Sequence, residues 1–167
     1  MRLLYGLLFI IVMMADGLAD GQVIHKKLPL SETLPLLQQI DDAALRMGSG
    51  PVKVYVFVDP LCPHSRNFVE MIAESDKMRA RYSYFFYLYT LKRMHSERVV
   101  ESIYMSKKPL EAFLAVMLRH QELRPVSKVS PEVQKKIEKI EAVGVKIDAY
   151  KRPYLIMVKK PKPKRGH

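Results

Sequence analysis

One short segment combines a reactive side chain with residues that could tune it. Cys62 is the only cysteine in the 167-residue chain, and Pro63 directly follows it. Proline is common in the first turn of a helix, where its missing N–H costs no hydrogen bond. A thiol at a helix start lies beside unpaired backbone N–H groups and the positive end of the helix dipole, which favour a thiolate. The sequence therefore predicts a nucleophilic thiol at Cys62, and a protonated His64 would add to its reactivity.

Two further polar residues flank this thiol. Ser65 lies three residues after Cys62, and its hydroxyl could donate a hydrogen bond to the thiolate. Asp59 lies three residues before Cys62 and is a candidate proton acceptor at the site. A simple Asp-Pro turn with Pro60 explains Asp59 equally well, so both interpretations stay open.

The remaining residues give no sign of a metal or cofactor site. The histidines show no ligand spacing relative to one another or to Cys62; they are His25, His64, His95, His120 and His167. We therefore expect no metal. No phosphate-binding loop, nucleophile elbow or zinc-protease motif occurs, so we expect no cofactor.

Apolar patterning predicts an α/β chain that places Cys62 between a strand and a helix. The run from Val52 to Val58 is typical of a buried strand, and Asp59-Pro60 ends it. The expected elements, in chain order, are a helix from Thr33 through Leu45, a strand at 52–58, a helix from Cys62, a strand at 82–89, helices beginning near Ser96, Pro109 and Ser130 (the last closed by Gly144), and a strand at 153–158.

The first nineteen residues are typical of a secretory signal peptide. Arg2 precedes an apolar run at 3–14, and Ala19 is a plausible cleavage point. The run is shorter than the roughly 20 residues that span a bilayer, although an uncleaved anchor is an alternative. We therefore expect an exported protein.

Positive charge is concentrated at the other end of the chain. The net charge is +11, and five lysines and arginines fall within residues 159–167. Such a tail is expected to be solvated or to make weak electrostatic contact with a membrane surface. No nucleic-acid-binding motif accompanies it, so nucleic acid is not an expected partner.

The segment around Cys62 resembles the active-site strand and helix of the thioredoxin-fold disulfide oxidoreductases of the bacterial periplasm, especially the DsbG/DsbC isomerases. The resemblance rests on Tyr55-Val56-Phe57, Asp59-Pro60 and Cys62-Pro63, and Pro63-His64 is similar to the dipeptide of the DsbA oxidases. It implies a periplasmic thioredoxin-like domain over residues 51–158, and this domain would contain a helical insertion. An N-terminal arm and helix at 20–50 would precede this domain, and the strand and helix that normally end the fold are apparently truncated.

The resemblance also assigns roles near the end of the chain. Pro153 falls where the family has a cis proline that contacts substrate, although a trans proline opening an edge strand is the alternative. Arg152 stands where relatives commonly have a small residue, and its guanidinium could favour the thiolate or bind an acidic partner. The strand after Pro153 is expected at a sheet edge, which the arm at 23–28 or another protein could complete.

One departure from the family limits the chemistry. Ser65 occupies the position of the second cysteine, so the motif is Cys-Pro-His-Ser. The resemblance implies thiol–disulfide exchange on exported proteins through Cys62, of the isomerase or monothiol reductase type. The alternative is a redox-inactive binding or assembly protein of a secretion or conjugation system in the cell envelope.

Overall fold

Two parallel strands form the centre of the protein. The computed structural model describes residues 25 and 27–158, and its central strands are β2 (Val52–Val58) and β3 (Tyr82–Leu88). They pair in register from Val52 opposite Tyr82 to Val58 opposite Leu88. The last five residues of each strand are buried, so helices must cover both sheet faces. The strands predicted at 52–58 and 82–89 are thus confirmed.

Shorter antiparallel strands complete the sheet on either side. The strand order is β1-β3-β2-β4, in which β1 (Leu45–Met47) pairs with β3 and β4 (Tyr154–Val158) pairs with β2. Within residues 27–158, no strand pairs with the outer side of β1 or β4. The prediction that the last strand lies at a sheet edge is confirmed.

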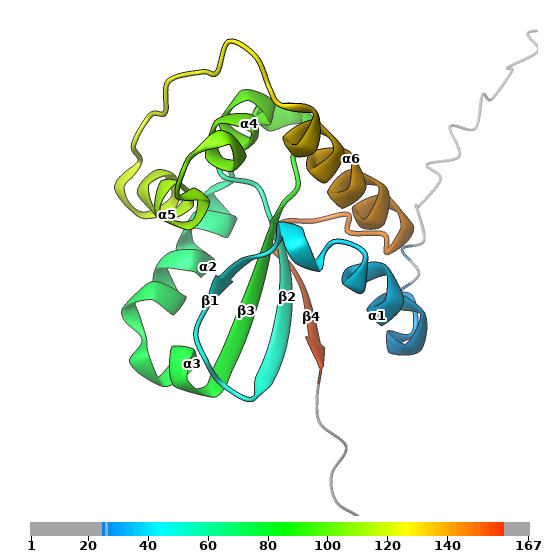
Figure 1. The fold of residues 1–167 in the computed structure, drawn as a ribbon. Coiled ribbons are helices and arrows are strands. Elements are labelled where there is room, and N and C mark those ends of the chain that lie inside the picture. Colours follow the sequence, from blue (N-terminus) through cyan, green and yellow to red (C-terminus); the bar gives the residue numbers. More distant parts are fainter. Residues whose placement is uncertain (1–24, 26, 159–167) are drawn as a thin grey trace, which may run out of the picture.

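Helices flank the sheet (Figure 1). They are α1 (Leu30–Gln38), α2 (Pro63–Glu74), α3 (Asp76–Arg81), α4 (Glu97–Met105), α5 (Pro109–Arg119) and α6 (Pro131–Lys146), with short 3-10 turns η1 (Asp41–Ala43) and η2 (Lys92–Met94). Phe68 of α2 packs on Tyr84, and Phe113 of α5 packs on Phe86, so these two helices cover the same sheet face. In Figure 1, α1 and α6 lie on the opposite side of the molecule from α2 and α3.

The helix predicted from Thr33 through Leu45 is wrong in its second half. The helix ends at Gln38, and Leu45 begins β1, where it lies opposite Phe86 of β3. The apolar spacing of Ile40 and Leu45 was interpreted as helical. Local spacing does not show that Leu45 pairs with β3, and this pairing determines its conformation. Gly48 then turns the chain towards β2 with a φ of 82°, a conformation that other residues rarely adopt.

The helix predicted to close at Gly144 also differs from the structure. α6 continues to Lys146, and Gly144 is a buried residue of its last turns. The helix starts that were predicted near Ser96, Pro109 and Ser130 agree with α4, α5 and α6.

The aromatic run of β3 belongs to the core, as predicted. Tyr87 and Phe86 have no exposed surface. Tyr104 of α4 is also buried; its hydroxyl donates to the Ala43 carbonyl at 3.1 Å and accepts from the Leu88 amide at 3.4 Å. Burial raises the pKa of Tyr104, so the hydroxyl keeps its proton.

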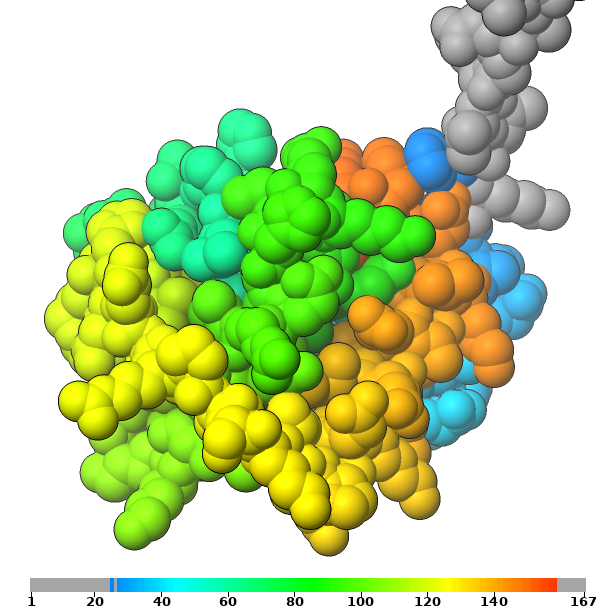
Figure 2. All heavy atoms as spheres, turned by 90° about the horizontal axis from the view of Figure 1, so that it is seen from above, coloured from blue at the N-terminus to red at the C-terminus, as the bar shows by residue number. Residues whose placement is uncertain are grey.

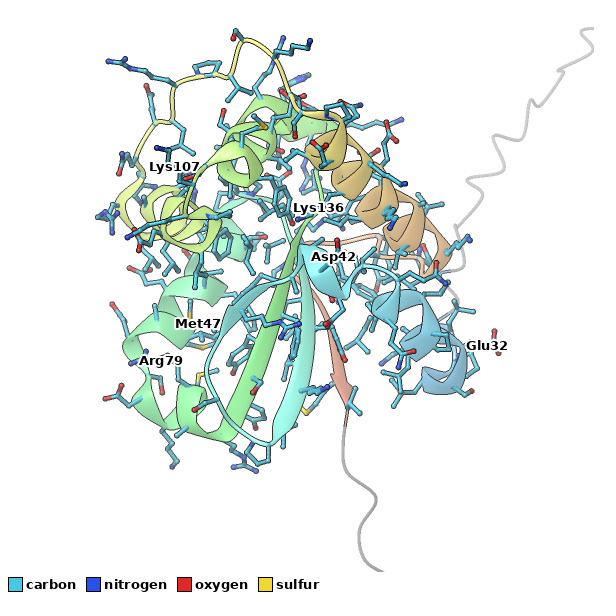
Figure 3. The ribbon with its side chains drawn as sticks, viewed as in Figure 1. Glu32, Asp42, Met47, Arg79, Lys107 and Lys136 are labelled. Atoms are coloured by element: carbon cyan, nitrogen blue, oxygen red, sulfur yellow. The ribbon has the colours of Figure 1, made fainter. Side chains whose placement is uncertain are left out.

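Lys136 of α6 (Figure 3) lies over the Tyr104 ring.

The predicted signal peptide and basic tail lie outside the described residues. Within the part of the chain that the structure describes, no helix has the length and apolar character needed to cross a membrane.

Candidate active site around Cys62

Cys62 lies at the start of α2, as the sequence predicted. It is the N-cap residue, with φ −75° and ψ 121°, and its carbonyl accepts the first helical hydrogen bond from the Arg66 amide. The Cys62 amide donates to the Asp59 carbonyl at 3.1 Å. Because Pro63 occupies the first helical position, the sulfur lies at the positive end of a twelve-residue helix. The residue is only 2% exposed, so a substrate must displace neighbouring groups to reach it.

Ser65 makes its hydrogen bond with the backbone of the Asp59 loop and not with the thiol. It has no exposed surface, and its Oγ accepts a hydrogen bond from the Asp59 amide at 3.2 Å. The hydrogen bond from Ser65 to Cys62 that the sequence suggested does not occur among the described residues; the loop amide takes its place because the first turn of α2 presents Ser65 to the end of β2. His64 is exposed on the same turn.

The Asp59 carboxylate joins the Cys62 loop to the segment after β3. It is fully buried. Its Oδ1 accepts from the Leu61 amide at 2.8 Å, and its Oδ2 accepts from the Leu91 amide at 2.6 Å and from the Ser96 hydroxyl at 2.7 Å. Three donors satisfy the carboxylate, which supports the turn interpretation of Asp59. Its role as proton acceptor stays a prediction.

The hydrogen bond between Ser96 and Asp59 was not predicted from the sequence, and the position of Ser96 explains why. It precedes α4, where we expected it to cap the helix, and it does occupy the N-cap position. Its hydroxyl makes no capping hydrogen bond and donates to Asp59 instead. Serine at a helix start looks the same in sequence whichever acceptor it uses, so no local signal distinguishes the two.

The peptide bond between Arg152 and Pro153 is cis, as the resemblance implied. In the β2–β4 ladder Tyr154 lies opposite Phe57. Pro153 therefore lies level with the last residue of β2, at the sheet end from which the Cys62 loop leaves. The substrate-binding role of Pro153 stays a prediction.

Arg152 holds two loops together at this end of the sheet. It is 8% exposed, and its guanidinium donates to the carbonyls of Tyr89 at 2.8 Å, Ala149 at 2.5 Å and Lys151 at 2.8 Å, with a longer contact to Thr90 at 3.4 Å. So many internal acceptors leave little of the guanidinium for an external acidic partner. The binding of such a partner by Arg152 stays a prediction.

The surroundings of Arg152 also connect it to the thiol. Burial lowers the pKa of the Arg152 guanidinium, and Tyr89, Asp59 and Cys62 oppose that shift. Negative charge on Asp59 or Cys62 thus favours the charged guanidinium.

Tyr89 is a site residue that sequence reasoning missed. The Arg152 guanidinium lies 3.7 Å from the centre of the Tyr89 ring, a cation–π contact. Phe57 meets the same ring edge-on, with ring centres 6.0 Å apart. A Cβ at Gly144 would lie 2.5 Å from Tyr89 Cε1, which is too close for a real side chain. Glycine at this position therefore allows α6 to pack against the ring. The one available signal was a glycine inside a helical pattern.

We predict that Gly144→Ala destabilises the protein even though alanine is the better helix former. Helix propensity alone would stabilise the variant by about 1 kcal/mol. The added methyl group overlaps Tyr89 and pushes it against Arg152, which should cost more, leaving a net loss of about 1–2 kcal/mol in urea unfolding. The double variant Gly144→Ala/Tyr89→Leu removes the ring, so it should be more stable than Tyr89→Leu alone. If Gly144→Ala is as stable as the parent, the packing described for Tyr89 is incorrect.

Arg66 fixes the other side of the site. Its Nε donates to the Pro60 carbonyl at 2.8 Å, and its NH1 lies 2.6 Å from Nδ1 of His120, the residue that ends α5. Figure 2 looks onto this end of the molecule, where the start of α2, the segment after β3 and the chain leading to β4 meet.

The strand order, the thiol at the start of α2 and the cis proline before β4 define an α/β protein with a thioredoxin-like fold. Solved structures share this fold at low sequence identity. A disulfide interchange protein from Neisseria gonorrhoeae is 16% identical with a TM-score of 0.56, covering 74% of this chain and 89% of its own. The catalytic domain of Proteus mirabilis ScsC is 15% identical with a TM-score of 0.60, covering 75% and 85%.

A third structure is a periplasmic thioredoxin-like protein from Salmonella enterica serovar Typhimurium. It is 14% identical, with a TM-score of 0.57 and coverage of 79% of this chain and 86% of that one. No protein-family model and no curated protein sequence matches the chain.

Proposed function

We propose that this protein carries out thiol–disulfide exchange on exported proteins, with Cys62 as a monothiol nucleophile. The observation that carries the proposal is the position of Cys62 at the start of α2, at the same end of the sheet as the cis Arg152–Pro153 bond. The disulfide interchange protein and the ScsC catalytic domain, which share the fold, support it. The periplasmic relative and the predicted signal peptide support export.

A single thiol sets which reactions are available. The Cys62 thiolate attacks one sulfur of a substrate disulfide; a new disulfide joins Cys62 to the substrate, and the other substrate sulfur leaves as a thiolate. A neighbouring thiolate of the substrate then attacks the mixed disulfide and releases Cys62. Disulfides are rearranged with no net gain or loss of electrons, which is isomerisation. A small external thiolate can instead attack the mixed disulfide. Attack at the substrate sulfur releases Cys62 and leaves the external thiol on the substrate, whereas attack at the Cys62 sulfur releases the substrate and leaves the external thiol on Cys62. A second external thiol then completes the reduction, and the two external thiols leave as their disulfide.

The buried serine distinguishes this site from a dithiol site. Ser65 follows Cys62 by three residues, on the first turn of α2, and is fully buried. It cannot form a disulfide with Cys62, so the mixed disulfide persists until a thiol of the substrate or solvent resolves it. We therefore expect this protein to accumulate covalent complexes that a dithiol enzyme would release.

We predict that Cys62 forms a mixed disulfide with glutathione disulfide faster in the folded chain than in the same chain unfolded in urea. The sulfur lies at the positive end of the α2 dipole, and we expect an increase in rate on the order of tenfold despite the burial of the residue. Mass spectrometry of the full chain after timed quenching measures this rate. Cys62→Ala provides the blank. A slower reaction in the folded chain would indicate an inert cysteine and favour the binding-protein alternative.

Restoring the second cysteine gives an independent check. In Ser65→Cys, the new thiol should attack the Cys62 mixed disulfide, so the glutathione adduct disappears and an internal disulfide forms. Asn67→Cys is the matched control, because Asn67 is exposed further along α2 and faces solvent. If Asn67→Cys resolves the adduct as fast as Ser65→Cys, the geometry assigned to the start of α2 is wrong.

A further inference from the structure

A groove follows the outer edge of β4, from Pro153 to Met157. It consists of two adjoining cavities, of about 350 Å³ and about 110 Å³, that share Lys27 and Tyr154 as lining residues. The larger lies beside Tyr150 and Pro153, and the smaller lies between β4 and the chain around Leu28. We call these two cavities together the β4 groove.

The β4 groove offers both backbone and apolar contacts. No strand within the described residues pairs with this side of β4, so backbone N–H and C=O groups of the strand face outward there. Leu155 and Met157 line the groove and are 39% and 43% exposed. Leu28 and Ile156 line its smaller cavity. An edge strand with apolar pockets beside it is the surface to which an extended peptide adds as a further strand.

The charge of the β4 groove selects among possible occupants. Lys27 and Lys151 are exposed on its walls. Asp148 is the only acidic residue among the described residues that line it, and its carboxylate lies within hydrogen-bond distance of His25, 2.9 Å from Nδ1. Glu32 lies on the outer side of α1, away from the sheet (Figure 3). A second copy of this chain, with its net charge of +11, is therefore a poor occupant, whereas an acidic segment fits.

We propose that the β4 groove binds an extended segment of a partner protein in which apolar and acidic residues alternate. Its backbone pairs with the outer edge of β4, its apolar side chains enter the smaller cavity, and its carboxylates reach Lys27 and Lys151. This binding is noncovalent and does not involve Cys62, so it stands whether or not the thiol is reactive.

The test uses a short synthetic peptide that alternates valine with glutamate, labelled for fluorescence anisotropy and titrated with the full chain. We expect saturable binding that weakens as salt is added, because the glutamates meet two lysines. Lys27→Glu/Lys151→Glu should raise the Kd about tenfold. The matched control Lys135→Glu/Lys139→Glu makes the same charge change on exposed positions of α6, and it should change the Kd by less than about twofold.

Two altered peptides test how the segment is held. A peptide N-methylated at every amide has no N–H group to donate to a strand ladder and should not bind, and one with lysine in place of glutamate should not bind either. Equal binding by the N-methylated peptide, or equal losses in the two double variants, would overturn the proposal. A dimer seen by sedimentation that excludes the peptide would assign the groove to a second copy and overturn it as well.

Discussion

Asp59→Asn should lower the free energy of unfolding by about 3 kcal/mol or more. The buried carboxylate accepts from two backbone amides and one hydroxyl. An asparagine keeps the shape but turns one oxygen into an NH2 group, which would face a donor and leave it unsatisfied in the interior. Urea unfolding followed by circular dichroism measures the loss.

The control for this prediction is an aspartate in a different setting. Asp41 binds Arg46 at the surface, with both side chains about half exposed, so Asp41→Asn should cost less than about 1 kcal/mol. Ser96→Ala removes only one donor to Asp59 and should fall between, at about 1–2 kcal/mol. If Asp59→Asn costs no more than Asp41→Asn, the hydrogen bonds to the Asp59 carboxylate do not support the fold.

Arg152→Met should lower the free energy of unfolding by about 2–4 kcal/mol. Methionine fills much of the same volume but donates no hydrogen bond, so the carbonyls of Tyr89, Ala149 and Lys151 lose their partner in a nearly closed space. It also loses the charged contact with the Tyr89 ring. Equilibrium unfolding in urea, with the slope compared between variants, measures the change.

Two control substitutions distinguish the contribution of the Arg152 charge to stability from that of its hydrogen-bond geometry. Arg152→Lys keeps the positive charge but cannot reach both loops with one planar group, so it should recover less than half of the loss. Lys151→Met changes the exposed residue next to it and should shift stability by no more than about 0.5 kcal/mol. Full recovery by lysine would mean that charge alone, and not the fork of donors, holds the loops.

Local patterns predicted the parts of the site that depend on neighbouring residues. The strand to 58, the helix start at Cys62 and the order of elements follow from apolar spacing and turn residues, which act over a few positions. The cis bond before Pro153 came from family resemblance, since no local pattern distinguishes cis from trans proline.

What the sequence could not show depends on distant segments. Leu45 has the spacing of a helix residue, yet pairing with β3 makes it a strand residue. Arg152, expected to face a partner, turns inward because four carbonyls of two loops converge on it. Gly144 was expected to end a helix, but it lies within α6, where the Tyr89 ring packs against it. Each of these outcomes involves a group far away in the chain: strand β3 for Leu45, the Tyr89 and Thr90 carbonyls for Arg152, and the Tyr89 ring for Gly144.

The contacts that assemble the site also determine when it can form. Asp59 meets Leu91 and Ser96 across 32 and 37 positions of the chain, and Arg152 meets Tyr89 across 63. Closing such long loops costs entropy that is recovered only after β2, β3 and β4 have paired. The surroundings of Cys62 should therefore be completed late in folding and should be among the first regions to open afterwards. Because Cys62 is 2% exposed, the rate advantage expected for the folded chain would then depend on how often this region opens.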